Sequence, residues 1–100
     1  MNQISTVSQI TASDVADYLR LAETTQDDIN TLNTLLTVAK TYVCSYTGRK
    51  IEELDELQDI IIVVLILCQD MYDNRTLYVD SSNVNKVVES ILGLHSVNLL

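Results

Sequence analysis

The feature that most constrains this chain is an unbroken run of nine apolar residues, Ile60 to Cys68. As a helix such a run rises roughly 14 Å, whereas a membrane span needs about 30 Å. Together with its flanking residues the run spans Asp55 to Arg75, and we therefore expect this segment to form one helix of a globular fold. An ordinary surface helix is apolar along one stripe, but this one is apolar in every direction for more than two turns. Other helices of the chain must cover it, or a second chain must cover part of it.

The composition favours helices throughout. The sequence has 100 residues, no proline and two glycines, so it holds few residues suited to tight turns. Apolar residues make up 47% of the chain, and its aromatic residues are five tyrosines, which indicates a core of Leu, Ile and Val. One hundred residues suit one small domain, for which association with another chain adds useful burial.

Capping signals mark the first predicted helix. Thr11 or Ser13 can act as its N-cap, and Asp14 can complete a capping box with Thr11. Its apolar residues fall on one face from Val15 onward, and we expect it to end near Leu21.

The second predicted helix is long. Thr25 and Asp28 repeat the same start signal. Apolar residues then recur at spacings of three and four from Ile29 to Tyr46, which is the helical period. Gly48 supplies the left-handed residue that commonly ends a helix.

The central helix follows a short connection, residues 51–54. Asp55 is expected to cap it, with Gln58 answering as in a capping box. After Arg75 we expect an extended loop over residues 76–82 rather than a strand.

A final short helix is predicted near the end of the chain. Ser81 or Ser82 is its expected N-cap, and Gly93 is its expected stop. The predicted fold is all-α, a small bundle of two long antiparallel helices plus a short N-terminal and a short C-terminal helix. We expect residues 1–10 to be a flexible arm, residues 11–95 the helical domain and residues 96–100 a tail.

The charge of the chain argues against tight binding of nucleic acid. Six basic and fourteen acidic residues give a net charge of −8, whereas a protein that neutralises phosphates needs a basic surface. An acidic surface would let DNA pass without sticking, although many globular proteins carry one. The first residues lack the basic start and apolar core of a signal peptide, so we expect no secretion.

The usual signatures of enzymes are missing from the sequence. His95 is the single histidine and has no cysteine or acid close to it in sequence. The acids of residues 52–59 lack the spacing of a calcium loop. The sequence has no glycine-rich phosphate loop, no HExxH and no Gly-x-Ser-x-Gly. We therefore expect no catalytic activity, no metal and no cofactor.

The end of the central helix carries the most distinctive side chains. Tyr72 lies four residues after Cys68 and continues one apolar face. Arg75 either binds carbonyls at the helix end or pairs with an acid of the other long helix. Alternatively, it crosses a subunit boundary, where its forked donors suit a carboxylate of the next chain.

Four segments of the chain resemble the head-tail connector, or adaptor, proteins of tailed bacteriophages. The long helix ends in Tyr-Thr-Gly-Arg at Tyr46 to Arg49, and the apolar helix closes with Met-Tyr-Asp-Asn-Arg at Met71 to Arg75. The short final helix contains Val-Val-x-Ser-Ile-Leu, Val87 to Leu92, and the first contains Ser-x-Val-x-x-Tyr-Leu-Arg, Ser13 to Arg20. The resemblance covers roughly residues 11–95.

The resemblance implies a structural, non-enzymatic subunit. Such subunits form a homo-oligomeric ring of about twelve copies below the portal protein, with neighbouring copies related by one repeated contact. The ring extends the DNA channel and docks the next head-completion or tail protein. The protein would be made in the bacterial cytoplasm and reside in the virion at the head-tail junction. The expected residues of the subunit or portal interface are Tyr72, Asp73, Arg75, Ile62, Leu65, Leu99 and Leu100.

The sequence also allows an alternative hypothesis, in which the protein belongs to a different functional class. A small acidic helical regulator or protein-binding module would use the same apolar surface to recognise a partner protein. The excess of acid disfavours a version of this alternative that binds DNA.

Overall fold

The computed structural model describes residues 6–80 and 84–96. Within these residues the protein is all-helical, as predicted, and contains one short 3-10 helix and five α-helices. The elements are η1 (Val7–Gln9), α1 (Ala12–Tyr18), α2 (Gln26–Thr47), α3 (Ile51–Leu54), α4 (Asp59–Asn74) and α5 (Lys86–His95).

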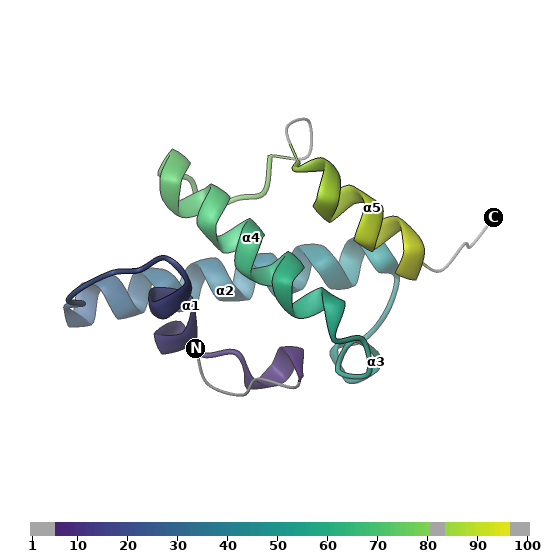
Figure 1. Ribbon diagram of the computed structural model, residues 1–100, viewed down its shortest axis with the longest axis horizontal. Helices are drawn as coiled ribbons and strands as arrows, with labels where there is room; N and C mark the ends of the chain where they lie inside the picture. The colour runs from purple at the N-terminus through teal and green to yellow at the C-terminus, as the bar shows by residue number, and fades with distance from the viewer. Residues whose placement is uncertain (1–5, 81–83, 97–100) are drawn as a thin grey trace.

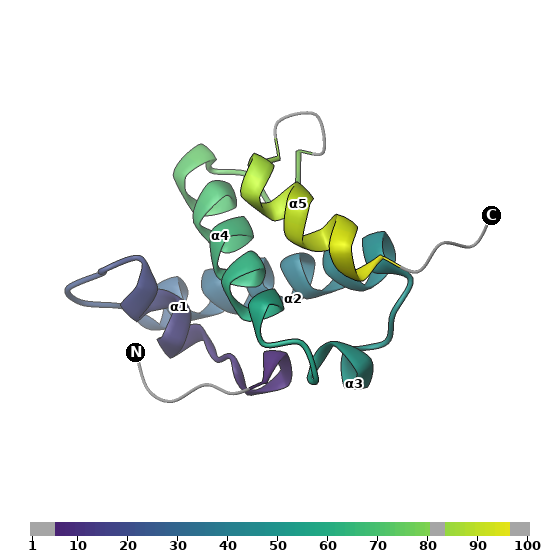
Figure 2. The ribbon, with the colours of Figure 1, turned by 45° about the vertical axis from the view of Figure 1, so that its right-hand side comes forward.

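The two long helices, α2 and α4, pack against each other and form the centre of the fold (Figure 1). They cross one another in both views rather than lying along each other (Figure 2). The antiparallel alignment expected from the sequence is not confirmed. Helices α1 and α5 each contact both long helices, so four helices share one core.

The chain itself covers almost all of the apolar run. The buried side chains of α4 are Ile60, Val63, Val64, Leu65, Leu67, Cys68 and Met71. They contact α1, α2, α5 and η1. Ile62 is 38% exposed and Ile66, one turn later, is half-buried, so the helix is open on one narrow side. The protein's own helices therefore bury most of the apolar surface of α4 that a second chain could have buried.

Two predicted capping boxes are confirmed. The Thr11 hydroxyl accepts a hydrogen bond from the backbone N–H of Asp14 at 3.3 Å, and the Asp14 carboxylate accepts one from the Thr11 N–H at 2.8 Å. Thr25 and Asp28 make the same exchange at 3.2 and 2.9 Å. Gly48 ends α2 with a φ of 71°, the left-handed conformation predicted for it.

The expected flexible arm differs from the structure over residues 6–10. Val7 and Ile10 are buried in the core, and η1 packs against α3 and α4. The Asp55 carboxylate accepts hydrogen bonds from the backbone N–H and the hydroxyl of Ser8, at 2.9 and 2.8 Å. Asp55 therefore anchors the N-terminal segment instead of capping α4, whose N-cap is Gln58. Residues 1–5 of the expected arm lie outside the described residues.

The end of the chain also departs from the prediction. Residues 51–54, expected as a connection, form the short helix α3. Asn85 caps α5 by accepting a hydrogen bond from the Val87 N–H at 2.7 Å. The expected caps Ser81 and Ser82 lie outside the described residues. Helix α5 does not stop at Gly93 but continues to His95.

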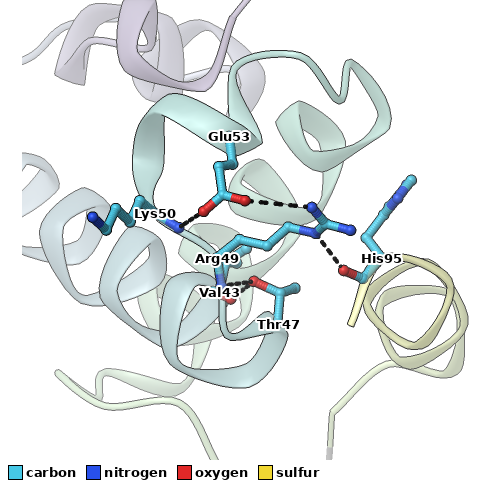
Figure 3. Close-up of polar contacts among 6 residues, drawn as sticks. All are labelled: Val43, Thr47, Arg49, Lys50, Glu53 and His95. Carbon is cyan, nitrogen blue, oxygen red and sulfur yellow. Dashed lines mark hydrogen bonds and ion pairs between the residues drawn. The ribbon is translucent and has the colours of Figure 1, made fainter. Parts of the chain in front are cut away.

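Contacts to the last turn of α5 explain its extra length. The Arg49 guanidinium donates a hydrogen bond to the His95 carbonyl at 2.6 Å and pairs with Glu53 at 3.7 Å (Figure 3). The His95 ring lies 2.8 Å from the Asp59 carboxylate at the start of α4. These tertiary contacts offset the low helix propensity of Gly93, which costs about 1 kcal/mol relative to alanine.

Candidate interaction site at the end of α4

Helix α4 ends at Arg75, which adopts a left-handed backbone with a φ of 56°. Its N–H donates to the Tyr72 carbonyl at 3.3 Å, and the Thr76 N–H donates to the Met71 carbonyl at 3.0 Å. This pair of bonds is a Schellman-type end, which usually has glycine at the left-handed position. The backbone of Arg75, rather than its guanidinium, therefore satisfies the carbonyls at the helix end.

The side chain of Arg75 packs on its own helix. Its guanidinium carbon lies 5.2 Å from the centre of the Tyr72 ring, which is the geometry of a cation–π contact. No ion pair joins Arg75 to an acid of α2 among the described residues, so that predicted alternative is not observed. Arg75 is exposed, and its guanidinium donors stay accessible to another molecule.

A pocket of about 380 Å³ opens beside the last two turns of α4, where the chain crosses to α5. This volume lies at the small end of the ~300–1,000 Å³ typical of ligand sites. Leu67, Met71, Val79 and Val84 form its apolar walls. A pocket this small suits one long side chain or a small molecule.

The polar side chains that line the pocket differ in whether they have a hydrogen-bond partner. The Asn74 amide donates to the backbone carbonyl of Asp70 at 2.8 Å, four residues earlier on α4. The Asp70 carboxylate is half-buried and makes no hydrogen bond or ion pair among the described residues. Burial, and secondarily the nearby charge of Asp73, raises the pKa of the Asp70 carboxyl above its ordinary value of 3.8. A cation in the pocket would relieve this unfavourable environment.

Exposed apolar side chains accompany the pocket. Tyr78 lines it and is 61% exposed, and the preceding residue, Leu77, is 60% exposed. Val87 is 56% exposed and lies two residues after Asn85, another lining residue. Single exposed apolar residues are common on proteins, but a pocket beside several of them is typical of a protein-binding surface.

The predicted site residues differ in how far the structure exposes their side chains. Tyr72 is half-buried, while Asp73 and Arg75 are exposed at the end of α4. Ile62 lies eleven residues before Asp73, three helical turns, so both belong to the exposed side of α4. Leu65 is 1% exposed and belongs to the core.

The assignment of Leu65 to an interface was therefore wrong. A helix that is apolar on all sides gives no sequence signal of which side the rest of the chain covers. The other two predicted interface residues, Leu99 and Leu100, lie outside the described residues.

The pocket was not predicted from the sequence. Asp70 and Asn74 are four residues apart and so share a face of α4, a signal that was available. The opposite wall comes from residues after α4 (Thr76, Tyr78, Val79 and Asp80) and from Val84 and Asn85 just before α5. The placement of these residues depends on tertiary packing. Spacing along the chain does not reveal such a pairing.

His95 likewise has a partner that the sequence did not indicate. Its Nε2 atom lies 2.9 and 2.8 Å from the two carboxylate oxygens of Asp59. The pair joins the last turn of α5 to the first turn of α4, at the opposite end of α4 from the pocket. Over residues 6–80 and 84–96, no three metal-binding side chains gather into a possible metal site. In the same residues, no helix has the length and apolarity to cross a membrane.

Comparison of the chain with protein-family models, with curated protein sequences and with solved structures finds no match.

Proposed function

We propose that this protein is a head-tail connector subunit of a tailed phage or prophage. The end of α4 is the observation that carries the proposal. Tyr72–Arg75, the most specific part of the resemblance, forms the end of α4, where the exposed Arg75 stacks on the half-buried Tyr72. The pocket and the exposed Leu77 and Tyr78 lie beside it. These features suit a surface that binds protein.

The proposed assembly is a ring of about twelve copies built by one repeated contact between neighbours. The ring lies below the portal protein, extends the DNA channel and docks the next head-completion or tail protein. In each subunit the two long helices run in opposite directions where they cross, and Leu99 and Leu100 contact the portal. The acidic balance of the chain allows DNA to pass through the lumen without binding. The subunit has no catalytic role.

Electron microscopy of lysates from the parent phage with this gene deleted tests the proposal, beside a control complemented with the wild-type gene. We expect DNA-filled or leaking heads separated from free tails, because the junction would be incomplete. Normal tailed particles from the deletion strain would exclude a connector.

Complementation with variants then tests the end of α4. Arg75→Ala removes both the guanidinium and its contact with Tyr72, and we expect a low yield of joined particles. Lys50→Ala removes an exposed cation at the start of α3 and is the matched control, which we expect to complement fully. Normal yield with Arg75→Ala would remove this helix end from the junction.

The second candidate function is a small acidic protein-binding module. The pocket favours it, because one long side chain of a partner would fill a volume of about 380 Å³. The deletion strain separates the two candidates, since loss of a regulator alters expression or lysis timing but leaves heads joined to tails.

A further inference from the structure

Two features of this chain reduce the stability of an isolated copy, and they carry opposite charges. Asp70 is a half-buried carboxylate without an ion pair or hydrogen bond among the described residues. Burying a charge without a partner is unfavourable. Arg20 has a φ of 59°, a left-handed backbone conformation that is unfavourable for any residue with a Cβ atom.

Arg20 occupies a helix end where glycine would fit without strain. The Leu21 N–H donates to the Ala16 carbonyl at 3.1 Å and the Arg20 N–H to the Asp17 carbonyl at 3.1 Å, which closes α1. The guanidinium of Arg20 is exposed and makes no ion pair among the described residues. Its side chain thus adds nothing to the described fold that would offset the strain of its backbone.

Arg20 suits the pocket better than the other cations of the chain. Arg49 pairs with Glu53, Arg75 stacks on Tyr72, Lys86 follows the pocket residue Asn85, and Lys40 is half-buried. Lys50 is exposed but lies in an unstrained backbone conformation, with a φ of −82°. Arginine also combines a long apolar stem with a forked donor, which matches apolar walls around a carboxylate.

We propose that the Arg20 side chain of one copy enters the α4–α5 pocket of a second copy and pairs there with Asp70. The inference rests on the proposed function, because it names the contact that repeats around the ring. Each copy supplies Arg20 from the α1–α2 connection and the pocket from the α4–α5 region, so every copy both gives and receives the contact.

Charge supports a second copy as the occupant. Two copies of net charge −8 repel each other, so their association needs a local contact between opposite charges. The Asp70 carboxylate in the pocket and the exposed Arg20 guanidinium, neither of which has an ion pair among the described residues, supply that contact. Pairing also relieves the desolvated carboxylate, which makes the gain larger than that of an ion pair at a fully exposed site.

The test is a mixing experiment on two charge-reversed proteins, Arg20→Glu and Asp70→Lys. We would measure self-association by sedimentation over a concentration series from micromolar to millimolar. Wild type is expected to associate, and each variant alone is expected to associate about tenfold more weakly or worse, because each brings like charges together. An equimolar mixture is expected to recover association, because the glutamate introduced by Arg20→Glu then meets the lysine introduced by Asp70→Lys. In the same mixture the native Arg20 of the second protein meets the native Asp70 of the first.

Matched controls come from residues with the same charge changes elsewhere. Lys50→Glu and Glu56→Lys alter the exposed start and end of the α3 region and should associate like wild type. Circular dichroism verifies that each variant is folded. Asp70→Asn and Arg20→Ala, which remove charge without reversing it, should also weaken association, and they replace a reversed variant that fails to fold.

The proposed contact would be excluded if self-association did not depend on the charges at positions 20 and 70. Unchanged association in both reversed proteins, no recovery in the mixture, or no association of wild type at millimolar concentration would each exclude it. These failures leave the connector proposal intact, because the phage deletion measures head-tail joining rather than this contact. Normal particles from the deletion strain would instead remove the connector while the mixing result stood.

Discussion

Arg20 and Arg75 are the two residues other than glycine that adopt positive φ angles among the described residues, and both end a helix. The left-handed backbone is unfavourable for each, but only Arg75 offsets part of the cost through its own chain, by stacking on Tyr72. This difference makes Arg20 the more informative position for measurements of stability.

Arg20→Gly is expected to raise the free energy of unfolding by about 0.5–1 kcal/mol, because relief of backbone strain exceeds the added flexibility of the unfolded chain. Arg20→Ala also removes the guanidinium but keeps the strain, so it should show no such gain. Urea unfolding of the three proteins at equal concentration measures the difference. Equal stability of the glycine and alanine variants would show that the backbone at position 20 is unstrained.

Asp70→Asn is expected to stabilise the isolated protein at neutral pH. Because burial raises the folded pKa of Asp70 above its ordinary value of 3.8, the folded state holds more protons than the unfolded chain between the two values. Stability therefore falls as pH rises through that interval. The gain from Asp70→Asn should be present above it and vanish below the unfolded value.

Thermal unfolding across pH measures this effect, with Glu56→Gln as the control for a general loss of negative charge. Glu56 is exposed on the turn after α3, so its replacement should give a smaller gain at neutral pH. Equal gains from the two variants would assign the effect to the net charge of the chain rather than to the site of Asp70.

At the scale of elements, local sequence predicted the starts of α1 and α2 and the end of α2. Their signals, Thr11 with Asp14, Thr25 with Asp28, and Gly48, act on the backbone within one turn. The ends set by distant contacts were not predictable in this way. Gly93 is helical because Arg49, in the connection between α2 and α3, and Asp59 of α4 hold the last turn of α5. These distant contacts are absent from the local sequence pattern.

For the apolar helix α4, the sequence did not predict which side faces the core. Its nine consecutive apolar residues predicted a buried helix correctly, but their pattern has no polar side to orient it. The structure supplies the orientation, with Leu65 in the core and Ile62 on the open side. The pocket was unpredictable for a related reason, since its two walls are brought together by the crossing to α5.

Leu65→Ala and Ile62→Ala form a matched pair that tests this orientation. We expect Leu65→Ala to cost about 2–5 kcal/mol of unfolding free energy, the usual cost of truncating a buried leucine. Ile62→Ala should cost less than about 1 kcal/mol, since a partly exposed side chain loses little burial. Chemical denaturation measures both. Similar losses would mean that the open side of α4 is covered in solution by a further contact.

The helices of one chain enclose the core of the molecule. From the sequence alone, a second chain could have supplied part of this enclosure. Helix α4 is covered by α1, α2, α5 and η1, and Val7 and Ile10 of the N-terminal segment close the core beside it. We therefore expect the purified chain to unfold in one cooperative transition whose midpoint is independent of protein concentration in the micromolar range. The α4 amides should be the most protected in hydrogen exchange, because they lie in the best-buried helix.

A midpoint that rises with concentration in that range would mean that folding depends on association, as for obligate oligomers. The open side of α4 would then belong to the core of an assembly rather than to its surface. A concentration-independent midpoint, combined with self-association at higher concentration, is the behaviour expected of a subunit that folds first and assembles afterwards. That order suits a ring contact built from one arginine and one pocket, because such a contact is too small to support folding and strong only when repeated.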